Sequence, residues 1–173
     1  MLTVTSRPVV SRVGTPLAPL SLVTDGEGAV LALDFEDFED RMRRLLARYH
    51  GPLTPVSGDP PRAVADALAA YFEGELTALD GLSVRMGGTA FQKGVWTALR
   101  AIPAGETRSY GALAATLGMP KAVRAVGLAN GANPAALIVP CHRVVGASGA
   151  LTGYAGGVAR KAWLLRHEGV LAA

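Results

Sequence analysis

In the stretch Ile138-Val139-Pro140-Cys141-His142-Arg143-Val144-Val145, the only cysteine of the chain lies between a proline and a histidine, within an apolar, strand-like run. A thiol attacks as its thiolate, and imidazole or cationic neighbours lower the pKa of a thiol. His142 and Arg143 supply both kinds of neighbour. A lone cysteine in a β run is ordinarily a small buried apolar group, but these neighbours favour a nucleophile.

The composition is that of a packed globular protein. Of the 173 residues, 50% are hydrophobic and 18% are charged, which excludes a disordered chain, and a net charge of +3 is compatible with nucleic acid as a partner. One cysteine excludes an internal disulfide and a Cys-rich zinc site, and its thiol persists in a reducing compartment. No apolar run reaches the roughly 18 residues of a membrane span, and Met1 to Ser11 lacks the pattern of a secretion signal. We therefore expect a cytoplasmic protein without a membrane span.

The first part of the chain, residues 1–88, is predicted to be an α/β domain. Short strand-like runs begin at Leu2 and are separated by turn signals, which predicts an antiparallel meander or hairpin set. Apolar residues at helical spacing then predict two helices, separated by a Pro- and Gly-rich connection. The predicted elements are strands at 9–13, 17–23 and 29–35 and helices at 37–50 and 64–72.

The second part, residues 89–173, is predicted to be mostly helical. Thr89 and Gln92 form a capping box in front of a helix that ends at Ile102-Pro103. Ser109 caps a helix over 110–117, and Pro120 is expected at the first position of a helix that runs to Asn130, which together suggest a helix-turn-helix. The reactive strand, glycine-rich loops at 146–149 and 153–157, and a last helix that ends at Glu168-Gly169 follow. The fold class is therefore α+β.

A catalytic arrangement can be assembled from residues that are distant in the sequence. Glu168, at the end of the last helix, could orient His142, which would then polarise Cys141 directly or through a water, as in thiol catalysis. His167 is interpreted as a surface histidine at a helix end. A metal site built from Cys141, His142, His167 and Glu168 does not match the usual zinc spacing, so no metal is expected.

The motifs from Thr89 to Gly169 resemble those of the O6-alkylguanine-DNA alkyltransferases, whereas the first 88 residues match only in general layout. The matching segments are Arg124-Ala125-Val126-Gly127, Asn133-Pro134, Pro140-Cys141-His142-Arg143-Val144, Gly153-Tyr154-Ala155-Gly156-Gly157 and Lys161-Ala162-Trp163-Leu164-Leu165-Arg166-His167-Glu168-Gly169. The resemblance implies a small ribonuclease-H-like N-terminal domain, a helical C-terminal domain with a helix-turn-helix, and direct transfer of an alkyl group from O6 of guanine to the cysteine. It implies no cofactor, and the zinc ligands of some animal members are lacking.

By this resemblance, Cys141 is a single-use acceptor, and His142, through water, and Glu168 supply its thiolate. Tyr110 would donate towards N3 of guanine, and Asn133 would brace the helix-turn-helix against the reactive strand. The carbonyls of Cys141 and Val144 would accept from the exocyclic amine of guanine. The implied substrate pocket comprises Pro140, Arg143, Val144, Tyr154, Ala155, Gly156 and Lys161.

The resemblance also implies that the partner is double-stranded DNA containing O6-alkylguanine, bound by a monomer, with cooperative binding left open. The target nucleotide would be flipped out of the duplex, and Arg124 would fill the vacated space. The helix around it would enter the minor groove, where backbone and shape contacts dominate. The implied DNA-binding residues are Ser109, Arg124, Ala125, Gly127 and Gly131, the last of which stands where some members have arginine.

Three other functions are compatible with parts of the sequence. A non-catalytic lesion-binding module, like the alkyltransferase-like proteins, would lack the acceptor cysteine. A thiol hydrolase using Cys141, His142 and Glu168 would need an oxyanion hole and would turn over many times. A transcription regulator fused to the alkyltransferase would need an additional domain.

Overall fold

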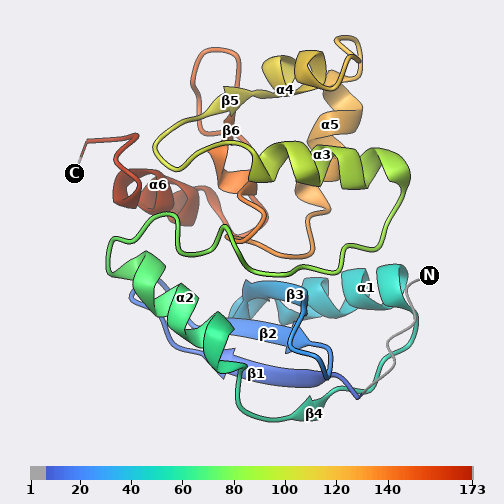
Figure 1. Ribbon diagram of the computed structural model, residues 1–173. Helices are drawn as coiled ribbons and strands as arrows, with labels where there is room; N and C mark the ends of the chain where they lie inside the picture. Colours follow the sequence, from blue (N-terminus) through green and yellow to red (C-terminus); the bar gives the residue numbers. More distant parts are fainter. Residues whose placement is uncertain (1–6, 173) are drawn as a thin grey trace. The chain divides into compact units, whose positions relative to one another are not determined.

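The computed structural model describes residues 7–172, which form two compact units (Figure 1). Residues 7–88 and 134–138 make up the first unit, and residues 89–133 and 139–172 make up the second. The second unit therefore is not one continuous segment, because five residues of the chain return to the first. The strand-like run expected from Leu2 lies, as far as residue 6, outside the described residues.

A four-stranded sheet forms the core of the first unit. Its order is β3-β2-β1-β4, with β1 at Val9–Val13, β2 at Leu20–Thr24, β3 at Val30–Phe35 and β4 at Val56–Ser57. β1 pairs antiparallel with β2, and β2 pairs antiparallel with β3, which confirms the predicted meander. The short β4 was not predicted, and it pairs parallel to β1.

Local side-chain bonds explain why β2 begins at Leu20 and not at Leu17. The Thr15 hydroxyl accepts from the amides of Leu17 and Ala18 and donates to the Ala18 carbonyl, so this segment is held in a turn. The far edge of the sheet at β3 is covered by two segments from elsewhere in the chain. Val30 donates to the Ser83 carbonyl, and Leu33 exchanges hydrogen bonds with the segment 134–136.

Two α-helices complete the first unit. A short 3₁₀ turn, η1 at Glu36–Phe38, leads into α1 at Glu39–His50, and α2 spans Arg62–Phe72. Met42 and Leu46 of α1 pack in one buried cluster with residues of β2 and β3, as their helical spacing predicted. α1 ends at His50 and is followed by Gly51, whose φ of 77° favours glycine.

The second unit is mostly helical, and its caps are those that the sequence predicted. α3 (Ala90–Arg100) begins with both hydrogen bonds of the Thr89–Gln92 capping box, and Ser109 accepts from the Ala112 amide at the start of α4 (Tyr110–Thr116). α5 spans Val123–Gly131 and α6 spans Val158–His167. The indole of Trp96 is fully buried and donates to the Ala129 carbonyl, which joins α3 to α5.

Pro120 is not the first residue of α5, contrary to the prediction. The Ala122 amide donates to the Met119 carbonyl, so Pro120 occupies the second position of a turn, and the helix begins at Val123. Proline fixes φ near −65°, a value that suits the second position of a turn as well as the first position of a helix. The sequence alone did not distinguish the two.

The predicted reactive strand is also wrong over most of its length. Cys141–Arg143 form a 3₁₀ turn, η2, and only Val144–Val145 form a strand, β6, which pairs parallel with β5 at Arg108–Ser109. Pro140 has no amide hydrogen to donate to a sheet, and the Cys141 amide donates to the Val139 carbonyl within a tight turn. The stretch is apolar because it is buried, not because it is a strand.

The six α-helices and two sheets of residues 7–172 confirm the α+β class. None of the helices in this range is long and apolar enough to cross a membrane.

Candidate active site

Cys141 is the first residue of η2 and is only 6% exposed. Its position is fixed by the preceding turn, in which Pro140 and the Cys141–Val139 backbone bond leave little freedom. The Asn133 amide donates to the Val139 carbonyl over 2.7 Å, so this side chain holds the turn two residues before the thiol. Asn133 is itself buried.

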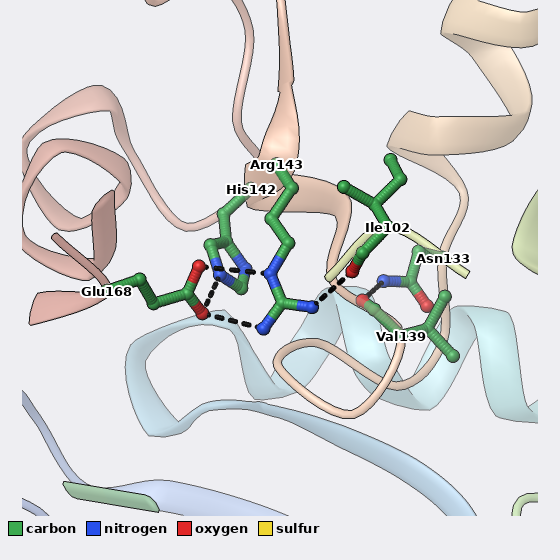
Figure 2. Close-up of polar contacts among 6 residues, drawn as sticks. All are labelled: Ile102, Asn133, Val139, His142, Arg143 and Glu168. Atoms are coloured by element: carbon green, nitrogen blue, oxygen red, sulfur yellow. Dashed lines mark hydrogen bonds and ion pairs between the residues drawn. The ribbon is translucent and has the colours of Figure 1, made fainter. Parts of the chain in front are cut away.

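His142 and Glu168 lie against each other in the interior of the second unit (Figure 2). The imidazole Nε2 is 2.8 Å from Oε1 of Glu168, and both side chains are fully buried. Burial lowers the pKa of His142, and the hydrogen bond and charge of Glu168 oppose this shift without overcoming it. The imidazole is therefore neutral at physiological pH, and its proton belongs on Nε2, where it faces the carboxylate.

Arg143 also binds the carboxylate of Glu168, through two hydrogen bonds. Its Nε is 3.0 Å from Oε2 of Glu168 and its Nη2 is 2.8 Å from Oε1, while Nη1 donates to the Ile102 carbonyl over 2.7 Å (Figure 2). Burial acts to raise the pKa of Glu168, but the hydrogen bonds from His142 and Arg143 outweigh it and lower this pKa to about 2. Glu168 is thus a permanent anion shared by an imidazole and a guanidinium.

The resemblance implies a place for Arg143 in the substrate pocket, and the sequence did not predict its pairing with Glu168. A signal for it was present, because a buried carboxylate needs a compensating cation. Arg143 directly follows Cys141 and His142 in the sequence, and a guanidinium can bind a carboxylate through two donors.

Lys161, on α6, is fully buried and donates to backbone carbonyls. Its Nζ bonds the carbonyls of Val144 and Thr152, the latter over 2.9 Å, so it ties the glycine-rich loop to β6. Burial lowers the pKa of Lys161, although a thiolate at Cys141 would act to raise it. The Val144 carbonyl, expected to bind the guanine amine, already accepts from Lys161, and the Cys141 carbonyl already accepts from the Val144 amide.

Tyr110 and the loop at 146–157 lie beside one another. The Tyr110 hydroxyl donates to the Thr152 carbonyl over 3.4 Å, and a side chain at Gly153 would come within 3.8 Å of this hydroxyl. Burial raises the pKa of Tyr110, so the phenol keeps its proton and is a donor. Tyr154 and Ala155 of the same loop are half-buried and Gly156 is buried.

The residues predicted to bind DNA lie on and beside α5. Arg124, Ala125 and Gly131 are exposed and Gly127 is half-buried, whereas the opposite side of the helix, with Val126 and Ala129, is buried. Ser109 differs from these, because its hydroxyl caps α4.

Comparisons with known proteins show the family to which the chain belongs. The family model described as "6-O-methylguanine DNA methyltransferase, DNA binding domain" matches residues 90–170. A protein of Salmonella typhimurium called methylated-DNA--protein-cysteine methyltransferase is 53% identical over 162 residues, which cover 92% of this chain and 95% of that protein. The chain belongs to the methylated-DNA--protein-cysteine methyltransferase family. A family member from Mycobacterium tuberculosis is 49% identical over 158 residues, 90% of this chain and 89% of its own length.

Solved structures extend the similarity to the whole fold. The crystal structure of Mycobacterium tuberculosis OGT in complex with DNA matches with a TM-score of 0.79 and 42% identity, covering 92% of this chain and 91% of that one. The O6-methylguanine-DNA methyltransferase of the archaeon Pyrococcus kodakaraensis matches with a TM-score of 0.68 and 25% identity, covering 94% and 99%. Coverage above 90% includes most of the first unit, where the sequence motifs had indicated only a general layout.

Proposed function

We propose that this chain repairs DNA by moving an alkyl group from O6 of guanine to the sulfur of Cys141. The C–S bond forms while the C–O6 bond breaks, so the thiolate supplies the electron pair and guanine departs as an anion that takes up a proton. The observation that carries the proposal is the buried cluster of Cys141, His142, Arg143 and Glu168. The only thiol of the chain directly precedes, in the sequence, a neutral imidazole that is hydrogen-bonded to an ionised carboxylate.

His142 is the base in this scheme. Since Nε2–H donates to Glu168, the unprotonated Nδ1 is left to receive the thiol proton directly or through a water. Nδ1 has no hydrogen-bond partner among the described residues 7–172, so nothing within them competes for its lone pair. Arg143 keeps Glu168 ionised, and the resulting anion stabilises the imidazolium that forms.

Tyr110 is the proton donor to the departing base. Its raised pKa keeps the phenol protonated, and its weak 3.4 Å bond to the Thr152 carbonyl can be exchanged for a bond to N3 of guanine. The half-buried Tyr154 and Ala155 and the buried Gly156 would form the wall of the pocket. Four further residues would hold the backbone of this pocket in place: Pro140, Arg143, Val144 and Lys161.

A thioether to a simple alkyl carbon has no carbonyl for water to attack, so the product on Cys141 is stable. The chain contains no second cysteine to accept the group. Each molecule would therefore act once. A lesion-binding module without chemistry would not need a thiol beside a base, and a thiol hydrolase would regenerate its thiol.

DNA binding is assigned to α4 and α5, which we propose act as a helix-turn-helix whose second helix enters the minor groove. Arg124 would fill the space of the flipped nucleotide, and the small residues Ala125, Gly127 and Gly131 would allow close approach to the backbone. Residues 89–173 contain nine Lys and Arg and only two acidic residues, which suits a polyanion. We further propose a monomer acting in the reducing cytoplasm, with a ribonuclease-H-like first unit.

The decisive experiment titrates limiting protein against excess duplex that contains one O6-methylguanine. We expect transfer to stop at one methyl group per protein molecule, and intact-mass spectrometry with peptide mapping to place it on Cys141. Continued turnover beyond one equivalent with an unmodified thiol would instead support the hydrolase. Binding without any mass change would support the non-catalytic module.

A further inference from the structure

We infer that Leu128 is an apolar wedge of the DNA-binding face, which inserts against sugars and base edges beside the position taken by Arg124. The inference rests on the proposed function and adds a contact residue to it. Leu128 lies on α5 and is 70% exposed, the most exposed large apolar side chain in residues 7–172.

A single exposed leucine is ordinary on a protein surface, so its surroundings decide the matter. The four large apolar residues with at least 40% exposure in the described chain are Met119, Val123, Leu128 and Val158. Three of the four fall within ten consecutive residues, on α5 and the turn that leads into it (Figure 1). An apolar cluster of this kind marks a surface that becomes covered by a partner.

The charge of the segment indicates which partner covers it. Between Glu106 and Glu168 the sequence has no acidic residue, but it has seven lysines and arginines, including Lys121 and Arg124 on either side of Val123. A protein partner would ordinarily meet charges of both signs, whereas a polyanion selects for cations alone. A DNA duplex is therefore the occupant that fits both the apolar and the cationic side chains.

Leu128 lies on the same face of α5 as Arg124. Arg124, Leu128 and Gly131 follow the spacing i, i+4 and i+7, so they share the solvent face opposite the buried Val126 and Ala129. A side chain added at Gly131 would meet nothing within 4 Å, which shows that the surface beside Leu128 is open. Of these three residues, only Arg124 and Leu128 have side chains long enough to reach into a groove.

The spacing of these two side chains sets where Leu128 would act. Four residues advance an α-helix by about 6 Å, which is close to two base-pair steps of about 3.4 Å each. For a helix lying along the groove, Leu128 would contact the duplex about two steps from the nucleotide that Arg124 displaces. Apolar wedges of this type partly unstack a base step and bend the duplex.

The test compares Leu128→Ala and Leu128→Gln with the control Val158→Ala, which removes the exposed apolar residue outside the cluster. We expect both Leu128 variants to react about fivefold more slowly with duplex O6-methylguanine, from partial loss of one buried leucine. Reaction with O6-benzylguanine as a base in solution should be unchanged. The control should match the wild type on both substrates.

Two further measurements distinguish a wedge from a charge contact. In a Cys141→Ala background, Leu128→Ala should weaken duplex binding without changing the salt dependence, because no phosphate contact is lost. The second measurement places 2-aminopurine two base steps from the lesion, where unstacking raises its fluorescence. The fluorescence should rise when Cys141→Ala binds, and it should rise less when the Cys141→Ala, Leu128→Ala double variant binds.

Equal duplex rates for Leu128→Ala and the wild type would overturn the inference while leaving the proposed function intact. Slowing on both substrates would also overturn it, since Leu128 would then act through folding or the pocket. If the wild type dimerised and Leu128→Ala did not, the face would bind a second copy and not DNA. Failure of the wild type to methylate Cys141 from duplex would remove the proposed function itself.

Discussion

The two units both bury carboxylates, but they use them differently. In the first unit, Asp25 accepts from the amides of Glu27 and Ala29 and from Arg85, and thereby holds a turn against the sheet. In the second unit, Glu168 binds His142 and Arg143, and the next residue before His142 is the thiol. A buried ion pair alone therefore does not indicate a reactive site. The reactive neighbour, Cys141, makes the difference.

The same contrast holds for surface charge. Residues 1–88 contain eight arginines and twelve acidic residues, whereas residues 89–173 contain nine lysines and arginines and two acidic residues. The net positive charge of the chain therefore comes entirely from the second part. We assign both chemistry and DNA contact to the second unit, and the following predictions test that assignment.

The largest effect is expected for Cys141→Ala, which should abolish alkyl transfer to the protein. Binding to an alkylated duplex should be largely retained, because the exposed surface of α5 does not include the thiol. Transfer is measured by intact mass and binding by fluorescence anisotropy. Residual transfer by this variant would place a nucleophile elsewhere in the chain. It would then contradict the assignment of the chemistry to Cys141 in the second unit.

Replacement of the base or its partner should follow in size. We expect His142→Ala to slow transfer by about 100-fold or more, the usual contribution of a general base, and Glu168→Gln to slow it for the same reason. Both losses should appear with duplex and with O6-benzylguanine alike, since both reactions need the thiolate. A loss restricted to duplex would assign these residues to DNA binding.

Arg124→Ala should slow duplex repair by about 10- to 100-fold, because an unfilled stack costs a few kcal/mol. Its reaction with O6-benzylguanine should stay at the wild-type rate. The matched control is Arg44→Ala, which removes an exposed arginine from α1 in the first unit. If the control lost as much duplex activity, the first unit would share in DNA contact.

Acid should act with opposite signs on two buried carboxylates, Glu168 in the second unit and Asp34 in the first. The pKa of Glu168 is lowered from 4.5 to about 2, so its stabilisation of roughly 3 kcal/mol is present above pH 4.5 and is lost as the pH falls towards 2. Burial raises the pKa of Asp34 despite its pairing with Arg41, so its protonation on acidification favours the folded state. Urea unfolding between pH 5 and pH 3 should lose this dependence in Glu168→Gln and show a steeper one in Asp34→Asn.

The smallest effect concerns phosphate contact. Lys121→Gln should reduce the slope of log K against log salt by about one, with little change in the reaction of O6-benzylguanine. Arg48→Gln on α1 is the control of equal charge change, and its slope should equal that of the wild type. Equal changes in slope for both variants would mean that duplex binding follows net charge and not position.

The sequence predicted best those features that depend on adjacent residues. The Thr89–Gln92 capping box, the Ser109 cap and the helix over α1 were correct because each requires only residues within one or two turns. Pro120 was misplaced because proline suits two local conformations. The reactive stretch was misread as a strand because an apolar run of eight residues indicates burial without specifying the backbone.

The features that the sequence did not predict are long-range. The two hydrogen bonds from Arg143 to Glu168 join residues that are 25 apart in the sequence. The parallel pairing of β4 with β1 depends on the path that the chain takes through α1 between these strands. The roles of Cys141, His142 and Glu168 were predicted from the residues themselves, whereas those of Tyr110, Asn133 and Arg124 came from the resemblance. The structure adds the hydrogen bonds through which Lys161 and Arg143 hold the backbone around the thiol.

The return of residues 134–138 to the first unit has a consequence for how this protein can be recombined. Leu33 holds Pro134 and Ala136 by backbone hydrogen bonds, and the chain reaches the acceptor cysteine only a few residues later. A gene fragment that encodes residues 89–173 alone would lack the strand to which this segment is anchored. A cut between residues 88 and 89 therefore does not separate the two units cleanly, because the fragment would carry a segment of the first unit without its partner strand.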